Sequence, residues 1–210
     1  MDIDLSKHLG KIDRRVVLRD HDGKPAQVVI ATRRYETDIE DLWDAITNPE
    51  RIPRWFLPVS GDLRVGGRYQ LEGNAGGEIR TCDVPKRLEL TWEYGGQTSW
   101  VNLKLSPDGD GARLELEHTA HTPEGFWNQY GPGATGVGWD LSLVGLAEHL
   151  GDASAFDPAE AEQWPTTEDG KTFVDHSSSA WGEASVAAGT AAEAAQAAAK
   201  TTTAFYTGQG

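Results

Sequence analysis

Three consecutive segments near the middle of the chain alternate apolar and polar side chains, and this pattern limits the folds open to the sequence. In residues 87–94, apolar side chains occupy every second position from Leu88 to Tyr94. Residues 100–106 and 112–118 repeat the alternation. Because successive side chains of a β-strand point to opposite faces, each segment has one apolar and one polar face. The three segments therefore predict an antiparallel sheet with one face in solvent.

The chain is expected to open with a β-hairpin. Residues 14–19 and 26–35 are rich in Val and Ile, and Asp22-Gly23 lies between them. Asp-Gly favours a tight hairpin turn because Gly adopts positive φ without steric cost. Two shorter strands are expected after Gly-Gly pairs, at residues 68–72 and 78–84.

A capping box marks the first predicted helix. Residues 37–40 read Thr-Asp-Ile-Glu, so Thr37 can accept from the backbone N–H three residues on while Glu40 reaches back. The helix is expected to end near Asn48, before a short turn at residues 50–56.

A second helix is predicted at residues 138–150, after a loop at residues 119–137. Its apolar stripe, at helical spacing, consists of Trp139, Leu143, Leu146 and Leu150. A helix this apolar needs a large apolar surface to cover it, and the dry face of the sheet is the candidate. The predicted fold is therefore α+β, with a twisted antiparallel sheet wrapped around a long helix.

The composition changes after residue 151, which divides the chain into an α+β domain at residues 1–151 and a helical extension at residues 152–210. The extension is Ala-rich and carries nine acidic and two basic residues. Pro158, after Asp157, is typical of a helix start. An amphipathic stripe follows, formed by Phe173, Ser177, Ala180, Trp181, Ala184 and Ala188.

The extension is expected to end in a second helix after Gly189. Residues 190–193 read Thr-Ala-Ala-Glu, a further capping box. Short helices are marginal in water, and the aromatic residues, including Phe205 and Tyr206, need a covering surface. We expect docking on the first domain, as a cover over a pocket mouth, or on a second copy as a homodimer arm; the alternative is a disordered acidic tail.

Several classes of partner and cofactor are not expected. A net charge of −14 disfavours nucleic acid and anionic lipid. Cys82 is the single cysteine, and no signal peptide or long apolar span is recognisable, so a cytoplasmic protein is expected. His118 and His121 are too few ligands for a metal site. Residues 131–136 spell G-x-G-x-x-G, but no buried strand precedes them, so no dinucleotide cofactor is expected.

A pocket between sheet and helix is the predicted site. The chain has eight Trp residues, which offer broad, rigid apolar surfaces. The alternation in residues 87–94 faces the predicted helix across the dry side of the sheet. We expect the pocket to be lined by Trp55, Phe56, Tyr69, Leu90, Trp92, Trp139 and Leu143. Plain core packing is the alternative for each of them. If Tyr69 and Trp92 are buried, a ligand or water could satisfy their polar atoms.

Four motifs in order carry a family resemblance. Residues 41–46 contain a Trp-x-Ala signature after a strand, and residues 54–69 contain Trp-Phe followed by Gly-Gly-x-aromatic. Residues 85–92 read P-x-x-L-x-x-x-W, and residues 138–150 begin with Gly-Trp. This order resembles the START-like, or SRPBCC, superfamily with its helix-grip fold, and in particular bacterial proteins of the family named after the activator of the 90-kDa heat-shock chaperone ATPase. The resemblance covers residues 14–151 and implies a pocket without a shared reaction.

The leading functional hypothesis is a binding protein for a hydrophobic or amphipathic small molecule. The alternatives are a pocket enzyme of the cyclase or hydrolase-like kind, and a chaperone-associated, stress-related interaction protein. No catalytic residues are assigned, because Ser142 lacks a G-x-S-x-G elbow, and Glu115 and Glu117 lie on the expected polar face. The balance favours a protein that is not an enzyme.

Overall fold

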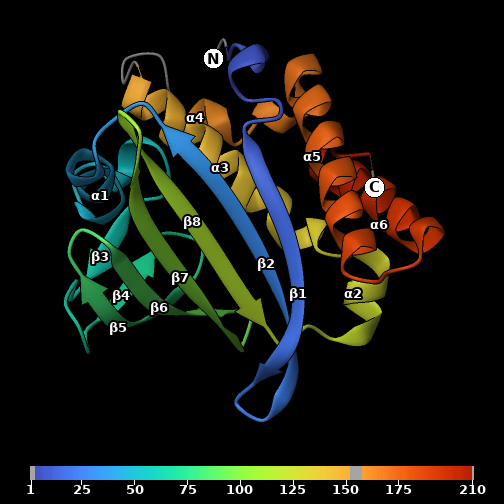
Figure 1. The fold of residues 1–210 in the computed structure, drawn as a ribbon, viewed down its shortest axis with the longest axis horizontal. Coiled ribbons are helices and arrows are strands. Elements are labelled where there is room, and N and C mark those ends of the chain that lie inside the picture. Colours follow the sequence, from blue (N-terminus) through green and yellow to red (C-terminus); the bar gives the residue numbers. More distant parts are fainter. Residues whose placement is uncertain (1–2, 152–157, 210) are drawn as a thin grey trace.

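The computed structural model describes residues 3–151 and 158–209. One eight-stranded antiparallel sheet curves around a long helix, α3 (Gly133–Gly151), as Figure 1 shows. The strands lie in the order β1-β2-β8-β7-β6-β5-β4-β3. Their bounds are β1 Ile12–His21, β2 Lys24–Tyr35, β3 Val59–Gly61, β4 Arg68–Leu71, β5 Gly76–Asp83, β6 Arg87–Tyr94, β7 Gln97–Asp108 and β8 Gly111–Ala120. The predicted α+β helix-grip fold is confirmed.

The strand alternation predicts the central sheet well. β6 matches the predicted segment. β7 and β8 extend beyond theirs, and they pair with each other from Trp100 opposite Thr119 to Asp108 opposite Gly111. The hairpin between β1 and β2 turns at Asp22-Gly23, with positive φ at both residues. β3 was not predicted, because three residues at a sheet edge leave no alternation to read.

The first helix, α1 (Ile39–Thr47), begins one residue later than the predicted capping box requires. Its N-cap is Asp38, whose Oδ1 accepts from the backbone N–H of Asp41 at 2.7 Å. Thr37 instead donates its hydroxyl to the Asp41 carboxylate at 2.7 Å. The correction has a simple cause, since Asp is at least as good an N-cap as Thr. A 3-10 turn, η2 (Ile52–Arg54), follows.

The predicted loop at residues 119–137 is wrong. It contains α2 (Glu124–Tyr130) and the first turns of α3, which begins at Gly133 instead of Gly138. The sequence does not indicate this helix start, because the segment contains several glycines and Gly has poor helix propensity. The structure gives their reason: a Cβ at Gly136 would lie 2.2 Å from the Trp181 ring, and one at Gly133 would lie 3.0 Å from Thr202.

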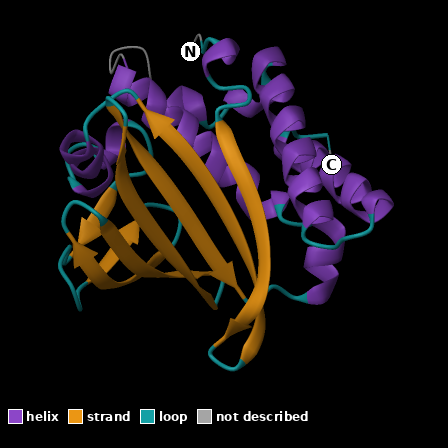
Figure 2. Ribbon diagram, in the orientation of Figure 1, coloured by secondary structure: helices purple, strands orange, loops and turns teal. Residues whose placement is uncertain are grey.

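These glycines let the C-terminal helices approach α3 closely. The helices are α4 (Pro158–Ala161), α5 (Glu168–Ala187) and α6 (Ala192–Tyr206), with a 3-10 turn, η3 (Trp164–Thr166), before α5. α5 packs against α3 and β1, and α6 packs against α5 and α2. In Figure 2 the helical layer continues from α3 past the β1 edge of the sheet. The expected docking on the first domain is confirmed, while residue 152 and Asp157 lie outside the described residues.

The predicted stripe on α5 is largely buried. Phe173, Ser177, Trp181 and Ala184 face the domain, whereas Ala180 and Ala188 are half-buried. The predicted capping box at residues 190–193 is wrong, because Ala191 is the N-cap of α6 and no side chain caps it. Phe205 is 61% exposed, contrary to the expectation that it is covered, although Tyr206 donates its hydroxyl to the Ala134 carbonyl at 2.8 Å.

A buried polar cluster joins α3, α5 and β1. Asp140 on α3 is fully buried, and its Oδ2 accepts from Arg14 Nε at 2.8 Å and Trp181 Nε1 at 3.0 Å. It also accepts from the Ser177 hydroxyl at 2.5 Å. Burial raises the pKa of the Asp140 carboxyl, and these three partners oppose that shift.

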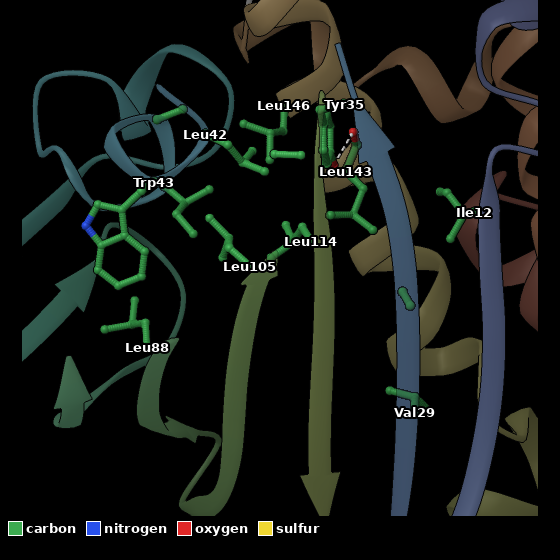
Figure 3. Close-up of a cluster of buried hydrophobic side chains, with 14 of the residues drawn as sticks. Ile12, Val29, Tyr35, Leu42, Trp43, Leu88, Leu105, Leu114, Leu143 and Leu146 are labelled. Carbon is green, nitrogen blue, oxygen red and sulfur yellow. Dashed lines mark hydrogen bonds between the residues drawn. The ribbon is translucent and has the colours of Figure 1, made fainter. Parts of the chain in front are cut away.

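The main core lies between the sheet, α1 and α3. Figure 3 shows Leu42 and Trp43 of α1 beside Leu105, Leu114 and Leu146. The Tyr35 hydroxyl, also in this core, donates to the Leu143 carbonyl at 3.3 Å. None of the helices in the described part of the chain is long and apolar enough to cross a membrane.

Candidate functional site

An apolar cavity lies beside this core, between the inner face of the sheet, the α1–η2 region and α3. Its volume is about 470 Å³. The structure brings all seven residues predicted for the pocket to its wall: Trp55, Phe56, Tyr69, Leu90, Trp92, Trp139 and Leu143. Residues from at least six helices and strands line the cavity, so it forms only when the chain is folded. No described residue after 151 lines it, so the predicted cover over its mouth by the extension is wrong.

Aromatic rings form one continuous wall of the cavity. The Trp55 and Phe56 rings stack with their centroids 5.4 Å apart, and Phe56 lies 6.3 Å from Trp139. Trp139 in turn meets Trp92 edge to face at 5.0 Å. Trp55 and Phe56 follow η2, Trp92 lies on β6 and Trp139 on α3, so the wall joins three parts of the chain. Offset and edge-to-face pairs at such distances are favourable and rigid.

A buried hydrogen-bond chain fixes the Trp139 ring. Trp139 Nε1 donates to His118 Nδ1 at 2.9 Å, and His118 Nε2 lies 2.8 Å from the Ser99 hydroxyl. Since Nδ1 accepts, the neutral ring carries its proton on Nε2 and donates to Ser99. The Ser99 hydroxyl then donates to the Trp92 carbonyl at 3.1 Å. Burial lowers the pKa of His118 from 6.5 to about 4, which keeps this ring neutral.

Three further polar groups of the cavity wall are also engaged by the protein. Tyr69 donates its hydroxyl to the Thr91 carbonyl at 2.8 Å, and burial raises the pKa of this phenol. Trp55 Nε1 donates to the Ala45 carbonyl at 3.0 Å, and the Ser142 hydroxyl donates to the Gly138 carbonyl at 2.9 Å. The hypothesis that a ligand or water satisfies Tyr69 is therefore wrong. For Trp92 it stays a prediction, because no described residue accepts from its indole N–H. The wall presents apolar surface to the cavity.

The mouth of the cavity is lined by exposed residues of the turn between β3 and β4. Leu63, Arg64 and Val65 lie on this turn, and Cys82 lies across from it on β5. The turn is held in place because the Ile79 carbonyl of β5 accepts from the Gly66 backbone N–H at 2.8 Å. It is therefore a fixed rim.

Comparison with known proteins decides the family. Residues 36–151, more than half of the 210, match the family described as "Activator of Hsp90 ATPase homolog 1-like protein". The chain belongs to this family. The resemblance inferred from the four sequence motifs is confirmed. All the residues that line the cavity lie within the matched range.

Solved structures extend the family likeness. The crystal structure of CalU16 from Micromonospora echinospora is 36% identical, covers 77% of this chain and 95% of its own, and gives a TM-score of 0.58. The solution structure of CalU16 is 33% identical, covers 85% of this chain and 98% of its own, and gives 0.71. The 85% of this chain that is covered corresponds to about 178 residues. This is more than residues 1–151 contain, so the likeness reaches into the C-terminal extension.

A more distant structure shows the fold alone. Protein MLL2253 from Mesorhizobium loti is 24% identical, with a TM-score of 0.52, and covers 62% of this chain and 98% of its own. Among curated proteins, the search found no significant match.

Polar side chains are a small part of the cavity lining. Its polar lining side chains are Thr47, Arg64, Tyr69, Cys82 and Ser142. No carboxylate, imidazole or amine is among the lining residues that the structure describes. Across residues 3–151 and 158–209, the structure shows no group of three or more His, Cys, Asp or Glu placed to hold a metal ion.

The sequence did not point to every important residue of the site. His118 and Ser99 are missed because strand alternation does not reveal their partners. Ser99 meets Trp92 through the β6–β7 pairing, and Trp139 reaches His118 from α3. Alternation could have found the aliphatic wall of Leu103, Leu114 and Leu116, which share the dry face with Leu90.

His121, paired with His118 in the metal hypothesis, lies away from the cavity, and its Nδ1 is 2.9 Å from the Pro25 carbonyl oxygen.

Proposed function

We propose that this protein binds an apolar or amphipathic small molecule in the cavity between the sheet and α3. The observation that carries the proposal is an apolar space of about 470 Å³ in which the hydroxyls of Tyr69 and Ser142 already donate to backbone carbonyls. Small-molecule sites typically measure about 300–1,000 Å³ and are lined mostly by apolar and aromatic groups.

An apolar molecule fills this space more favourably than water does. Water gains little beside a wall that offers few free polar partners. An unfilled cavity forfeits packing contacts, so an apolar molecule that fills it gains both dispersion contacts and hydrophobic burial. Trp55, Trp92 and Trp139 offer ring faces and edges that suit a broad, flat apolar body.

A catalytic role and a chaperone-directed role are separate hypotheses. The family's description refers to activation of the Hsp90 ATPase. The cavity's composition supports neither a reaction nor a chaperone contact, and we place the function in ligand binding.

The test is an equilibrium titration with 1-pyrenebutanol, a flat neutral amphiphile whose emission reports burial. Ser142→Phe would place a ring in the cavity from α3, and we expect it to abolish saturable binding. Ser179→Phe is the matched control, because Ser179 is exposed on α5 and does not line the cavity. Saturable binding by the native chain and by Ser179→Phe, with loss in Ser142→Phe, is the expected result. Equal binding by all three proteins would place the site elsewhere.

A further inference from the structure

Arg64 is the only charged side chain among the cavity-lining residues that the structure describes. It lies at the mouth, on the turn that begins after β3, between the exposed apolar residues Leu63 and Val65. Resting on the proposed function above, we propose that the ligand is an anionic amphiphile whose charged end lies against Arg64 while its apolar body fills the cavity.

The interior of the cavity determines which end of the ligand lies at the mouth. The hydroxyl donors of Thr47, Tyr69 and Ser142 go to backbone carbonyls, at 2.7, 2.8 and 2.9 Å. A charged group inside would lose its water and find no cation, and the one donor without a described acceptor there, the Trp92 indole N–H, is neutral, so burial of the charge is unfavourable. A ligand with one charged end should therefore keep that end at the mouth.

The Arg64 guanidinium has donors to spare. Its Nε contacts both carboxylate oxygens of Asp62, at 2.9 and 2.8 Å, and no other described residue makes a polar contact with it. The two terminal nitrogens are free, and their planar fork matches the two oxygens of a carboxylate or the oxygens of a phosphate or sulfonate.

The turn holds Arg64 close to this geometry. The Gly67 backbone N–H donates to the Arg64 carbonyl at 2.8 Å, and a Cβ at Gly67 would lie 2.0 Å from the Asp62 carbonyl oxygen. The side chain is long and exposed, but its backbone is fixed relative to β5. Leu63 and Val65 flank it with apolar surface that suits the first carbons of the ligand below its charged end.

The net charge of the chain makes a comparison between an acid and its neutral analogue informative. A net charge of −14 repels anions, so general electrostatics would disfavour an acid relative to its neutral analogue. A preference for the acid must then come from a local cation. In the cavity wall that cation is Arg64.

The experiment compares 1-pyrenebutyric acid with 1-pyrenebutanol at pH 8, where the acid is ionised. These ligands share their apolar body and differ in the charged end. We measure the ratio of acid to alcohol affinity for the native chain, Arg64→Gln and Arg68→Gln. Arg68 is the matched control: it is exposed, ion-paired with Glu93 at 2.6 Å, and absent from the cavity wall.

We expect Arg64→Gln to lower the acid-to-alcohol ratio by about three- to tenfold, as for a partly solvated charge-assisted pair. Its alcohol affinity should fall by less than its acid affinity, and its melting temperature should stay at the native value. Arg68→Gln should leave the ratio unchanged. An unchanged ratio in Arg64→Gln, or equal loss of both ligands, would overturn the assignment while leaving the proposed function intact. If neither ligand binds the native chain, the proposed function fails, and this inference fails with it.

Discussion

The two faces of α3 differ in how closely they are packed. The face toward α5 is filled, because Gly136 admits the Trp181 ring and Asp140 accepts hydrogen bonds from Arg14, Ser177 and Trp181. The face toward the inner sheet is hollow, with Trp139 and Ser142 bordering the cavity. Only one of the two faces is packed.

This difference separates stability from function within a single helix. A filled face contributes through close packing and paired buried polar groups. A hollow face gives up packing contacts that side chains of another size could make, and such a cost is typical of a binding site. The account therefore predicts large stability effects on the α5 side and large binding effects on the cavity side.

Removing the extension should have the largest effect. A chain of residues 1–151 lacks Trp181 and Phe173, both about 1% exposed in the full chain, and it uncovers the glycine face of α3. We expect this fragment to lose cooperative thermal unfolding and to associate, because a large apolar surface would meet solvent. The measurement is circular dichroism melting with size-exclusion chromatography. A monomeric fragment with the native melting temperature would show that the packed face is dispensable.

Single truncations should then separate the two faces. Trp181→Ala should lower the free energy of unfolding by about 3–5 kcal/mol, through lost packing and a lost partner of Asp140. Phe56→Ala should cost about 1–2 kcal/mol, since its ring borders empty space on one side. Urea unfolding measures both. Equal costs would contradict the contrast between a filled and a hollow face.

Strand alternation and helix spacing predict most of this fold, but they are blind to packing. Leu114 and Leu143 have the same apolar signature whether they border a cavity or fill a core. Gly133 and Gly136 lower helix propensity locally, so the sequence does not indicate the first turns of α3. The structure explains these glycines, because Trp181 and Thr202 occupy the space that their Cβ atoms would need. His118 likewise carries no local signal, because its partners come from distant segments.

The His118 chain should make stability depend on pH. His118 has a folded pKa of about 4, below its ordinary 6.5, so the unfolded chain binds the proton more readily. Stability should therefore be full above pH 6.5 and fall as the pH drops toward 4, with roughly 2–4 kcal/mol from this residue.

His118→Asn isolates that contribution, since burial also lowers the pKa of His8 and His149. Chemical unfolding at several pH values between 7 and 4 should show a shallower acid loss in the variant than in the native chain. Parallel curves would mean that His118 does not stay neutral behind Trp139.

The smallest stability effect is expected for Ser142→Phe. Its new ring would enter existing space, so the free energy of unfolding should change by less than about 1 kcal/mol, unlike the 1–3 kcal/mol of typical overpacking. Differential scanning calorimetry measures this. A large destabilisation would mean that the cavity has no room for a ring and would undercut its use as a ligand site.

The indole N–H signals of the Trp residues test the central claim most directly. In ¹⁵N-labelled protein, saturation with 1-pyrenebutanol should shift the signals of Trp55, Trp92 and Trp139, which line the cavity. Those of Trp164 and Trp181, buried on the packed side, should stay in place. Assignment follows from single Trp→Phe variants. Shifts confined to Trp164 and Trp181, or no shift at saturating ligand, would contradict a binding site on the hollow face of α3.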